Sequence, residues 1–328
     1  MANSENKAVE SAASMQREVQ REQDRRDETQ GQQKESKEPV QTGHHDQPGP
    51  PLPQQHLGKP GIEADMELKP SFLAPDYCGS GKLAGMTAIV TGGDSGIGRA
   101  VAVLYAREGA DVAIIYLDEH EDAAETKRYI EAEGQTCMLL PGDVRDPQFC
   151  RTAVDRVLQE LGHIDILVNN AAFQEHAGSL AELSEERFDL TMKTNVYGYF
   201  HMAKAVEPHL KRGSSIINTG SVTGLQGSKH LLDYSTTKGA IHAFTMSLAS
   251  NLLDKGIRVN AVAPGPVWTP LNPADQPPEK IAKFGESTDM KRPAQPEELS
   301  PAYVFLAAPC CSSYITGIVL PVTGSVGS

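Results

Sequence analysis

Tyr234 and Lys238 stand four residues apart in the segment DYSTTKGAIHAF, and together they could move a proton. This spacing places both side chains on one face of a helix. A phenol titrates near pH 10 and is a poor base at neutral pH, but a neighbouring ammonium stabilises the phenolate and lowers its pKa. Ser221 ends the apolar segment SSIINTGS, where its hydroxyl could hydrogen-bond a substrate oxygen. Each residue alone also has an ordinary surface or capping role, but together they predict general acid–base chemistry.

A glycine-rich turn lies earlier in the chain, in the run TGGDSGIG at 91–98. An apolar, β-forming segment precedes it at 86–90, and apolar residues at helical spacing follow it at 99–108. Glycine permits a tight turn and lets backbone N–H groups approach a pyrophosphate, while the helix N-terminus adds a partial positive charge. The sequence therefore predicts a dinucleotide site formed by Gly92, Asp94, Ser95, Gly96, Ile97 and Gly98.

From residue 83 onward, short apolar strands alternate with amphipathic segments. Strands are predicted at about 86–90, 111–115, 136–140, 164–168, 214–219, 257–262 and 317–321, and helices near 95–108, 120–133, 147–160, 184–211, 233–254 and 297–307. Runs of Val, Ile and Leu without alternation indicate strands that are buried on both faces. The pattern predicts an α/β fold of Rossmann type, a single domain with a doubly wound parallel sheet of about seven strands and helices on both faces. Ligands should then bind at the carboxyl ends of the strands.

The first part of the chain has a different composition. Residues 1–50 hold few aliphatic residues and many Gln, Glu, Ser, Arg and Pro, which predicts a disordered polar tail. Residues 51–82 are rich in Pro and Gly but carry spaced apolar side chains such as Leu57, Met66 and Phe72. We expect an extended arm that lies on its own domain or across a neighbouring subunit. Residues 83–328 are then the catalytic domain.

Charge, hydropathy and cysteine usage exclude several partner classes. The 328 residues carry a formal net charge of −13, which argues against nucleic acid or an anionic membrane as a partner. No apolar run is long enough to span a membrane, and the N-terminus lacks the apolar core of a secretory signal. Five cysteines without ligand spacing predict reduced thiols in the cytoplasm and no metal site.

Several motifs, which follow one another along the chain in the family's order, resemble those of the short-chain dehydrogenases/reductases. The turn at 91–98 resembles the family's TGxxxGIG, and the segment 169–172 resembles its NNAG with Ala172 in place of the last Gly. Pro264-Gly265 with Thr269 resembles its PG motif, and the resemblance covers about residues 83–324. The arm further resembles a bacterial subfamily with an N-terminal extension, named for a glucose or general stress dehydrogenase. The family's catalytic tetrad falls at Asn195, Ser221, Tyr234 and Lys238.

This resemblance implies an NAD(P)-dependent oxidoreductase that transfers a hydride between nicotinamide and a small alcohol or carbonyl compound. Tyr234 would be the general acid/base, Lys238 would also bind the nicotinamide ribose, and Asn195 would hold a water in a proton relay. Asp143 would accept from the adenine amino group, although it could instead cap the helix that begins near Pro147. A homotetramer is the implied assembly. The further cofactor-binding residues are Tyr116, Val144, Asn169, Ala171, Pro264, Gly265, Val267 and Thr269.

The choice between NAD and NADP depends on the end of the second strand, which reads Tyr116 rather than an acid or a base. Asp94 and the acids at 118–119 would repel a 2′-phosphate, and Arg99 lies on a helix where it could face solvent. These residues slightly favour NAD.

The irregular, Pro-rich segment 266–292 is the predicted substrate lid. Amide and imidazole groups around its mouth could hydrogen-bond the hydroxyls of a sugar or polyol. The residues expected at that mouth are Phe173, Gln174, Gln226, His230 and Trp268.

Two other functions compete with a dehydrogenase. A dinucleotide-binding structural or sensing protein could retain the fold with vestigial catalysis, but such a site should lose its Tyr or Lys early. An isomerase or epimerase on a related fold would need room for a sugar-nucleotide domain, which the short region after Pro264 does not provide.

Overall fold

The computed structural model describes residues 18, 20–22, 25 and 38–326. The chain divides into two compact units, Met1–Glu38 and Pro39–Ser328. The described residues of the first unit at 18, 20–22 and 25 are helical, and the second unit carries the fold discussed below. No helix in the described part of the chain is both long and apolar enough to cross a bilayer.

Seven parallel strands form one sheet, as the sequence predicts, and their order is β3-β2-β1-β4-β5-β6-β7. The strand order reverses at β1, which lies between β2 and β4, so a crevice opens beyond the carboxyl ends of these strands. The strands are β1 (Thr87–Thr91), β2 (Asp111–Tyr116), β3 (Cys137–Pro141), β4 (Ile166–Asn169), β5 (Ser215–Thr219), β6 (Arg258–Pro264) and β7 (Val319–Val322).

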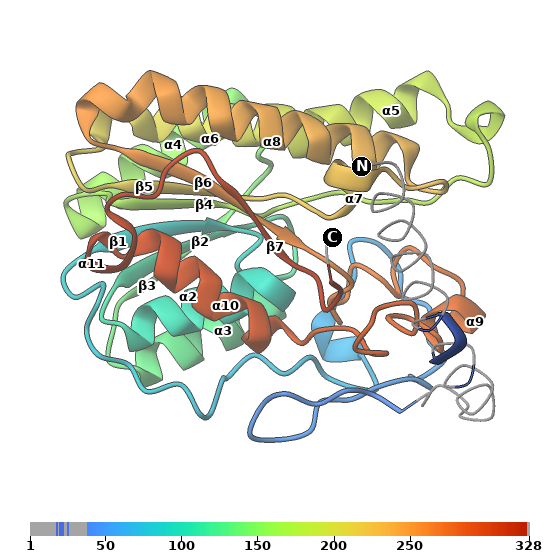
Figure 1. Cartoon of the computed structure of the whole chain (residues 1–328). Coiled ribbons are helices and arrows are strands. Elements are labelled where there is room, and N and C mark those ends of the chain that lie inside the picture. The colour runs from blue at the N-terminus through green and yellow to red at the C-terminus, as the bar shows by residue number, and fades with distance from the viewer. Residues whose placement is uncertain (1–17, 19, 23–24, 26–37, 327–328) are drawn as a thin grey trace, which may run out of the picture. The chain divides into compact units, whose positions relative to one another are not determined.

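Helices cover both faces of the sheet (Figure 1). One face packs against α4 (Pro147–Leu161), α6 (Gly198–Val206) and α8 (Leu232–Leu252), and the other against α2 (Gly96–Arg107), α3 (His120–Ala132) and α10 (Pro296–Ala307). On the first side, α5 (Glu185–Met192) lies beside α8. Successive residues of β1 alternate between two apolar cores, because Ala88 and Val90 join the core under α2 and α10 while Ile89 joins the core under α4 and α6. The short helices are α7 (Thr223–Gln226), α9 (Pro278–Ile281), α11 (Pro309–Ser312) and the 3₁₀ turns η1 (Glu63–Asp65), η2 (Leu180–Glu182), η4 (Glu207–His209) and η5 (Leu253–Lys255).

The helix predicted over 184–211 is interrupted. A π-helical turn, η3 (Lys193–Tyr197), separates α5 from α6, and Asn195 is buried at its centre. Such turns occur mostly as single insertions within α-helices, frequently at functional sites. Apolar periodicity runs through both flanking helices and therefore does not reveal the interruption.

The arm lies on its own domain. The Leu52 amide donates to the Ala282 carbonyl at 3.0 Å, and the Leu57 amide donates to the Pro273 carbonyl at 2.9 Å. Leu52, Leu57 and Met66 are buried in a small apolar cluster with Trp268 and Ile281. This cluster ties the arm to the predicted lid segment.

Residues 39–50 fall within the predicted tail, but they belong to the second unit and are anchored to its later segments. The Val40 amide donates to the Met290 carbonyl at 2.8 Å, and the Gln47 side chain donates to Glu297 at 2.8 Å. These anchors are polar, which is why a count of aliphatic residues misses them. Most of the predicted tail lies outside the described residues.

Candidate active site

A cavity of about 390 Å³ opens at the carboxyl ends of the strands. Six strands supply residues at or just beyond these ends, as expected for a parallel α/β sheet. They are Gly92 after β1, Tyr116 in β2, Gly142 after β3, Asn170 after β4, Thr219 in β5 and Pro264 in β6.

Three of the four predicted catalytic residues line this cavity. Ser221 follows β5, while Tyr234 and Lys238 come from the first turns of α8. Their side chains therefore meet from a strand end and a helix face, and all three are almost completely buried. The Ser221 hydroxyl accepts from the Thr223 amide at 3.1 Å, which fixes its orientation.

Lys238 is held in an apolar setting. Its Nζ donates to the Thr219 carbonyl at 2.7 Å and lies 5.3 Å from the centre of the Tyr234 ring. Burial lowers the pKa of Lys238 to about 7. An ammonium held here is costly, so its position indicates a functional role rather than a stabilising one.

The expected lowering of the Tyr234 pKa is not seen in this structure. Burial raises the pKa of Tyr234 above its ordinary value; the Ser221 hydroxyl opposes this shift and the charge of Asp275 adds to it. The physical reason is that burial penalises a phenolate and an ammonium alike.

Asn195 is buried and lies outside the cavity lining. Its Oδ1 accepts from the Phe173 amide at 2.7 Å, and its Nδ2 donates to the Phe173 carbonyl at 2.9 Å and to Thr237 Oγ1 at 3.0 Å. Asn195 therefore connects the π turn to α8 and to the loop after β4.

The glycine turn has the geometry of a phosphate cradle. Gly92 and Gly96 adopt φ of 62° and 49°, a left-handed region that favours glycine. Gly98 backs the turn, because a Cβ there would lie 1.8 Å from the Gly92 carbonyl oxygen. Ile97 lines the cavity at the start of α2, and the N-terminus of a helix suits a pyrophosphate. These residues fit a dinucleotide.

Acidic side chains line the cavity near the ends of β2 and β3. Asp94 and Glu119 line the cavity beside Tyr116, and burial raises the pKa of Asp94 to about 7. Asp143 lines it as well and pairs with Arg145 at 2.6 Å. The capping alternative for Asp143 is wrong, because Asp146 is the N-cap residue of α4.

Arg99 does not face solvent. It is 2% exposed and pairs with Glu63 of the arm at 2.6 Å and with Asp122 at 3.5 Å. No local pattern in the sequence predicts this burial, since both partners are distant in the chain.

The sequence predicts that Asn169 binds the cofactor, but its neighbour Asn170 is the residue that lines the cavity. Asn169 is fully buried and donates to Asn218 Oδ1 at 3.0 Å, which joins β4 to β5. Asn170 is the one that lines the cavity, and its Nδ2 donates to the Gly92 carbonyl at 3.2 Å. The remaining predicted cofactor residues that line the cavity are Ser95, Val144, Ala171, Pro264, Gly265, Val267 and Thr269.

The residues predicted for the substrate mouth separate into two groups. Phe173 and Gln174 line the cavity. Trp268 is fully buried beneath the arm, and its indole N–H donates to the Leu68 carbonyl at 2.9 Å. Gln226 and His230 lie outside the lining as well. Three residues that the sequence analysis did not single out line the cavity: Leu231, and Gln276 and Phe284 of the predicted lid segment.

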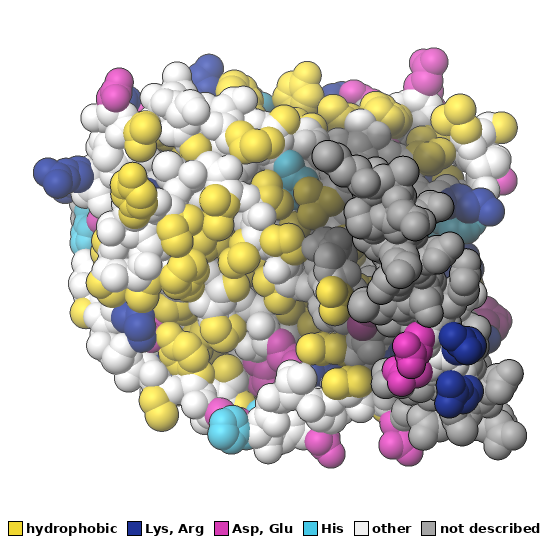
Figure 2. All heavy atoms as spheres, viewed as in Figure 1, with side chains coloured by type: hydrophobic (Ala, Val, Ile, Leu, Met, Phe, Trp, Pro, Cys, Tyr) yellow, Lys and Arg dark blue, Asp and Glu magenta, His cyan; other side chains and the backbone are white. Residues whose placement is uncertain are grey.

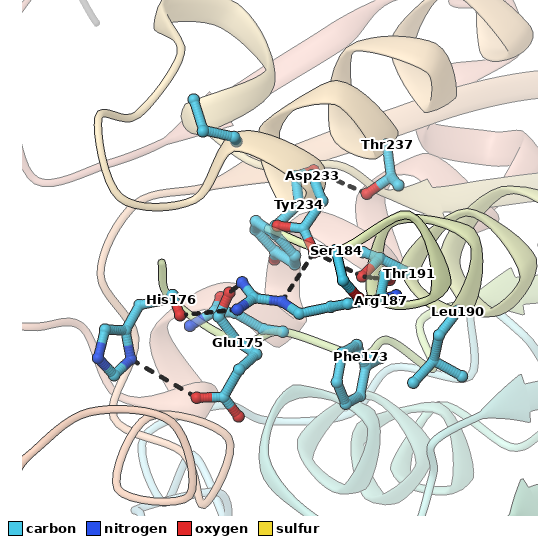
Figure 3. Close-up of polar contacts among 12 residues, drawn as sticks. Phe173, Glu175, His176, Ser184, Arg187, Leu190, Thr191, Asp233, Tyr234 and Thr237 are labelled. Atoms are coloured by element: carbon cyan, nitrogen blue, oxygen red, sulfur yellow. Dashed lines mark hydrogen bonds and ion pairs between the residues drawn. The ribbon is translucent and has the colours of Figure 1, made fainter. Parts of the chain in front are cut away.

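An ion pair supports the loop after β4 beside Tyr234. Arg187 of α5 lies between Asp233 and that loop, as Figure 3 shows. Arg187 Nε is 3.4 Å from Asp233 Oδ2, and the guanidinium donates to the carbonyls of His176, at 3.0 Å, and Glu175. Thr191 donates to the same Asp233 oxygen at 2.7 Å.

Glu175, His176 and Asp275 bring potential metal ligands within 4.8 Å of one another. Lys59 already pairs with Glu175 at 3.1 Å, and Gln174 and His176 both hydrogen-bond Asp275. These contacts account for the cluster without an ion.

Known proteins are similar to this chain in sequence and in fold. A family model described as Enoyl-(Acyl carrier protein) reductase matches residues 92–326. The uncharacterized oxidoreductase YhdF of Bacillus subtilis (strain 168) is 53% identical over 272 residues, which cover 83% of this chain and 94% of the relative. The chain belongs to the short-chain dehydrogenase/reductase family. It is therefore an oxidoreductase of a family that uses nicotinamide cofactors.

Two further relatives of this dehydrogenase/reductase carry more specific names. NADPH-dependent aldehyde reductase 1, chloroplastic, of Arabidopsis thaliana is 47% identical, and glucose and ribitol dehydrogenase of Daucus carota is 45% identical. The alignments cover 83% of this chain in both cases, and 96% and 95% of the relatives. A short chain dehydrogenase from Burkholderia cenocepacia J2315, solved in complex with NADP, is 34% identical with a TM-score of 0.70, over 75% of this chain and 100% of that one.

Proposed function

We propose that this dehydrogenase/reductase transfers a hydride between a nicotinamide dinucleotide and a small hydroxy or carbonyl compound. The observation that carries the proposal is the convergence of Ser221, Tyr234 and Lys238 on the same cavity as the glycine turn. The bound cofactor would supply or accept the hydride. The protein's own residues would bind, orient and move the proton.

Each residue has a role that its position supports. The Ser221 hydroxyl orients the substrate oxygen toward Tyr234, whose phenol gives or takes the proton. In its protonated form Lys238 would place a positive charge beside the phenol, and it would also bind the nicotinamide ribose. Asn195 fixes the backbone of the loop at Phe173, and through its hydrogen bond to Thr237 it links that loop to α8. A purely structural role in a sensing protein has no observation in its favour here.

We propose NAD ahead of NADP. Among the described residues that line the cavity, Lys238 carries the single basic side chain, and it belongs to the catalytic end. Asp94 and Glu119 oppose a 2′-phosphate, and Arg99 is already neutralised by Glu63 and Asp122. NADP is the cofactor of some similar proteins, since the Arabidopsis relative is named NADPH-dependent and the Burkholderia structure holds NADP.

For the substrate we propose a small polyol, sugar or aldehyde. The amides of Gln174 and Gln276 and the hydroxyl of Thr223 line the cavity beside the apolar Phe173, Leu231 and Phe284. This mixture suits a compact molecule with several hydroxyls. The names of the Daucus and Arabidopsis relatives agree with such substrates.

We propose that the protein assembles as a homotetramer. Figure 2 shows hydrophobic side chains gathered on the face that carries α10, α11 and β7. The exposed apolar residues in this region include Phe305, Tyr314 and Ile318, and a separate set on α5, η3 and α6 includes Phe188, Tyr197 and Phe200. Two distinct apolar faces are what a tetramer with two kinds of two-fold interface requires.

The test is a panel of sugars, polyols, simple alcohols and aldehydes, each offered with NAD(H) and NADP(H), followed by the absorbance of reduced nicotinamide. Turnover by the native protein would establish the dehydrogenase and identify the cofactor. A protein that binds the dinucleotide yet turns over nothing in the panel, at any pH tested, would favour the binding-protein alternative.

A further inference from the structure

The arm reaches the cofactor cavity directly. Pro60 and Gly61 line this cavity together with the glycine turn. Gly61 is packed so closely against the lid that a Cβ there would lie 2.8 Å from the Pro270 carbonyl oxygen. The segment 59–65 therefore extends from the lid to the glycine turn and forms part of the cavity wall.

Glu63 is seated against the start of α2. One carboxylate oxygen accepts from the Gly96 amide at 2.7 Å, and the other pairs with Arg99 at 2.6 Å. Ser95, the N-cap residue of α2, makes no side-chain capping bond. The arm thus supplies the acceptor that the first turn of this helix needs, from 33 residues earlier in the chain.

Asp122 of α3 fixes the same segment from the other side. Its two carboxylate oxygens accept from the Glu63 amide at 2.6 Å and the Ala64 amide at 3.1 Å. The side chains of Glu63, Arg99 and Asp122 are at most 3% exposed. Loss of one charge from such a buried cluster leaves another uncompensated. Arm and glycine turn are therefore held as one unit.

We propose that Glu63 is a positioning residue of the cofactor site, and that the docked arm segment 59–65 and a bound dinucleotide stabilise each other. This inference rests on the proposed function only in that the dinucleotide occupies this cavity. Glu63 holds the Gly96 amide from outside and leaves the start of α2 at Ile97 facing the cavity, while Arg99 neutralises the carboxylate that would otherwise repel a pyrophosphate. Coupling of this kind is reciprocal, so each partner tightens the other by the same factor.

The variant Glu63→Gln tests the first half of this coupling. It keeps an acceptor for the Gly96 amide but removes the charge that pairs with Arg99. Calorimetric titration with NAD and with ADP-ribose should show binding weakened about tenfold, and the KM for the dinucleotide should rise more than kcat falls. The matched control is Glu67→Gln, an exposed acid of the same arm, which should bind both ligands like the native protein.

Hydrogen exchange of the native protein tests the second half and needs no variant. The amides of Glu63 and Ala64, which donate to Asp122, should exchange more slowly once NAD is bound. Unchanged exchange at these amides, together with native affinity in Glu63→Gln, would overturn the inference and leave the proposed function standing. A native protein that bound neither NAD nor NADP would instead contradict the proposed function itself.

Discussion

At the scale of a single residue, Lys238 is a buried ammonium that lowers the stability of the fold. Its ammonium is 1% exposed and has one hydrogen bond, to the Thr219 carbonyl. Burial makes the charged form of Lys238 less favourable than it is in water. This cost appears as the lowering of the Lys238 pKa to about 7. We propose that Lys238 is retained for chemistry at the expense of stability.

We predict that Lys238→Met raises the free energy of unfolding by roughly 1–3 kcal/mol at pH 6.5 while turnover falls at least about 100-fold. The Thr219 carbonyl keeps a partner, because the Tyr199 hydroxyl donates to it at 3.2 Å. The unfolded lysine binds a proton up to about pH 10, whereas the folded one releases it near 7, so native stability rises with pH across that window. The advantage of the variant should therefore shrink at pH 9. Urea unfolding at both pH values measures it, and a less stable variant at pH 6.5 would contradict this account.

Asp94 gives a second pH-dependent prediction. Since burial raises its pKa to about 7, the carboxyl is largely neutral at pH 6 and charged at pH 8.5. We expect the preference for NAD over NADP to increase several-fold across this range as the charge opposes the 2′-phosphate. The phosphate itself gains charge in the same direction, so the variant Asp94→Asn is the necessary control. Dissociation constants for both cofactors decide the matter: an equal increase in the variant and in the native protein would remove Asp94 from the explanation.

At the level of elements, α5 and the loop after β4 form one support for the substrate side. Arg187 holds the carbonyls of Glu175 and His176 while it neutralises Asp233, the residue before Tyr234. One guanidinium thus fixes both the loop that carries Phe173 and the start of α8. Its planar fork makes these contacts at once, which an ammonium cannot do.

We predict that Arg187→Lys raises the KM for the substrate about tenfold or more, with a smaller change in the KM for the dinucleotide. The reason is that the loop moves on the substrate side and leaves the glycine turn in place. Arg156→Lys, on the exposed face of α4, is the matched control and should behave like the native protein. Steady-state kinetics with each ligand varied in turn measures the split, and equal effects on both KM values would count against a local role.

The sequence predicts the elements well and their polar contacts poorly. The strands are recognisable because most of them are rich in buried Val, Ile and Leu, and the site follows from motifs at their carboxyl ends. Arg99, Glu63 and Asp122 carry no periodic signal, because they meet only in the folded chain. Trp268 lies in an irregular segment, so the sequence suggests an accessible side chain. It is buried because residues of the arm cover it. The π turn at Asn195 is hidden within continuous helical periodicity.

For the whole molecule, the arm is part of the structure rather than an appendage. Leu52, Leu57 and Met66 are at most 7% exposed, and they cover Trp268, which is fully buried. Each such side chain contributes roughly 1.5–3 kcal/mol when buried. An arm that lies on its own domain can still contribute to a subunit interface.

We predict that deletion of residues 1–38 changes neither turnover nor assembly, because Pro39–Ser328 is a compact unit with its own cores. Deletion of residues 1–78 should lower Tm by roughly 10 °C or more and weaken dinucleotide binding. Sedimentation should also show a weaker tetramer if the arm contributes to an interface between subunits. A native melting curve after the longer deletion would contradict the packing described here.

The most direct test of the central claim compares native protein with Tyr234→Phe in a single turnover at saturating dinucleotide, with the best substrate of the panel. The phenylalanine keeps the ring that packs near Lys238 and removes only the hydroxyl. We predict unchanged dinucleotide affinity and hydride transfer slowed by about 10²–10⁴-fold. Hydride transfer at the native rate in Tyr234→Phe would show that the proton moves by another route and that the site has been assigned wrongly.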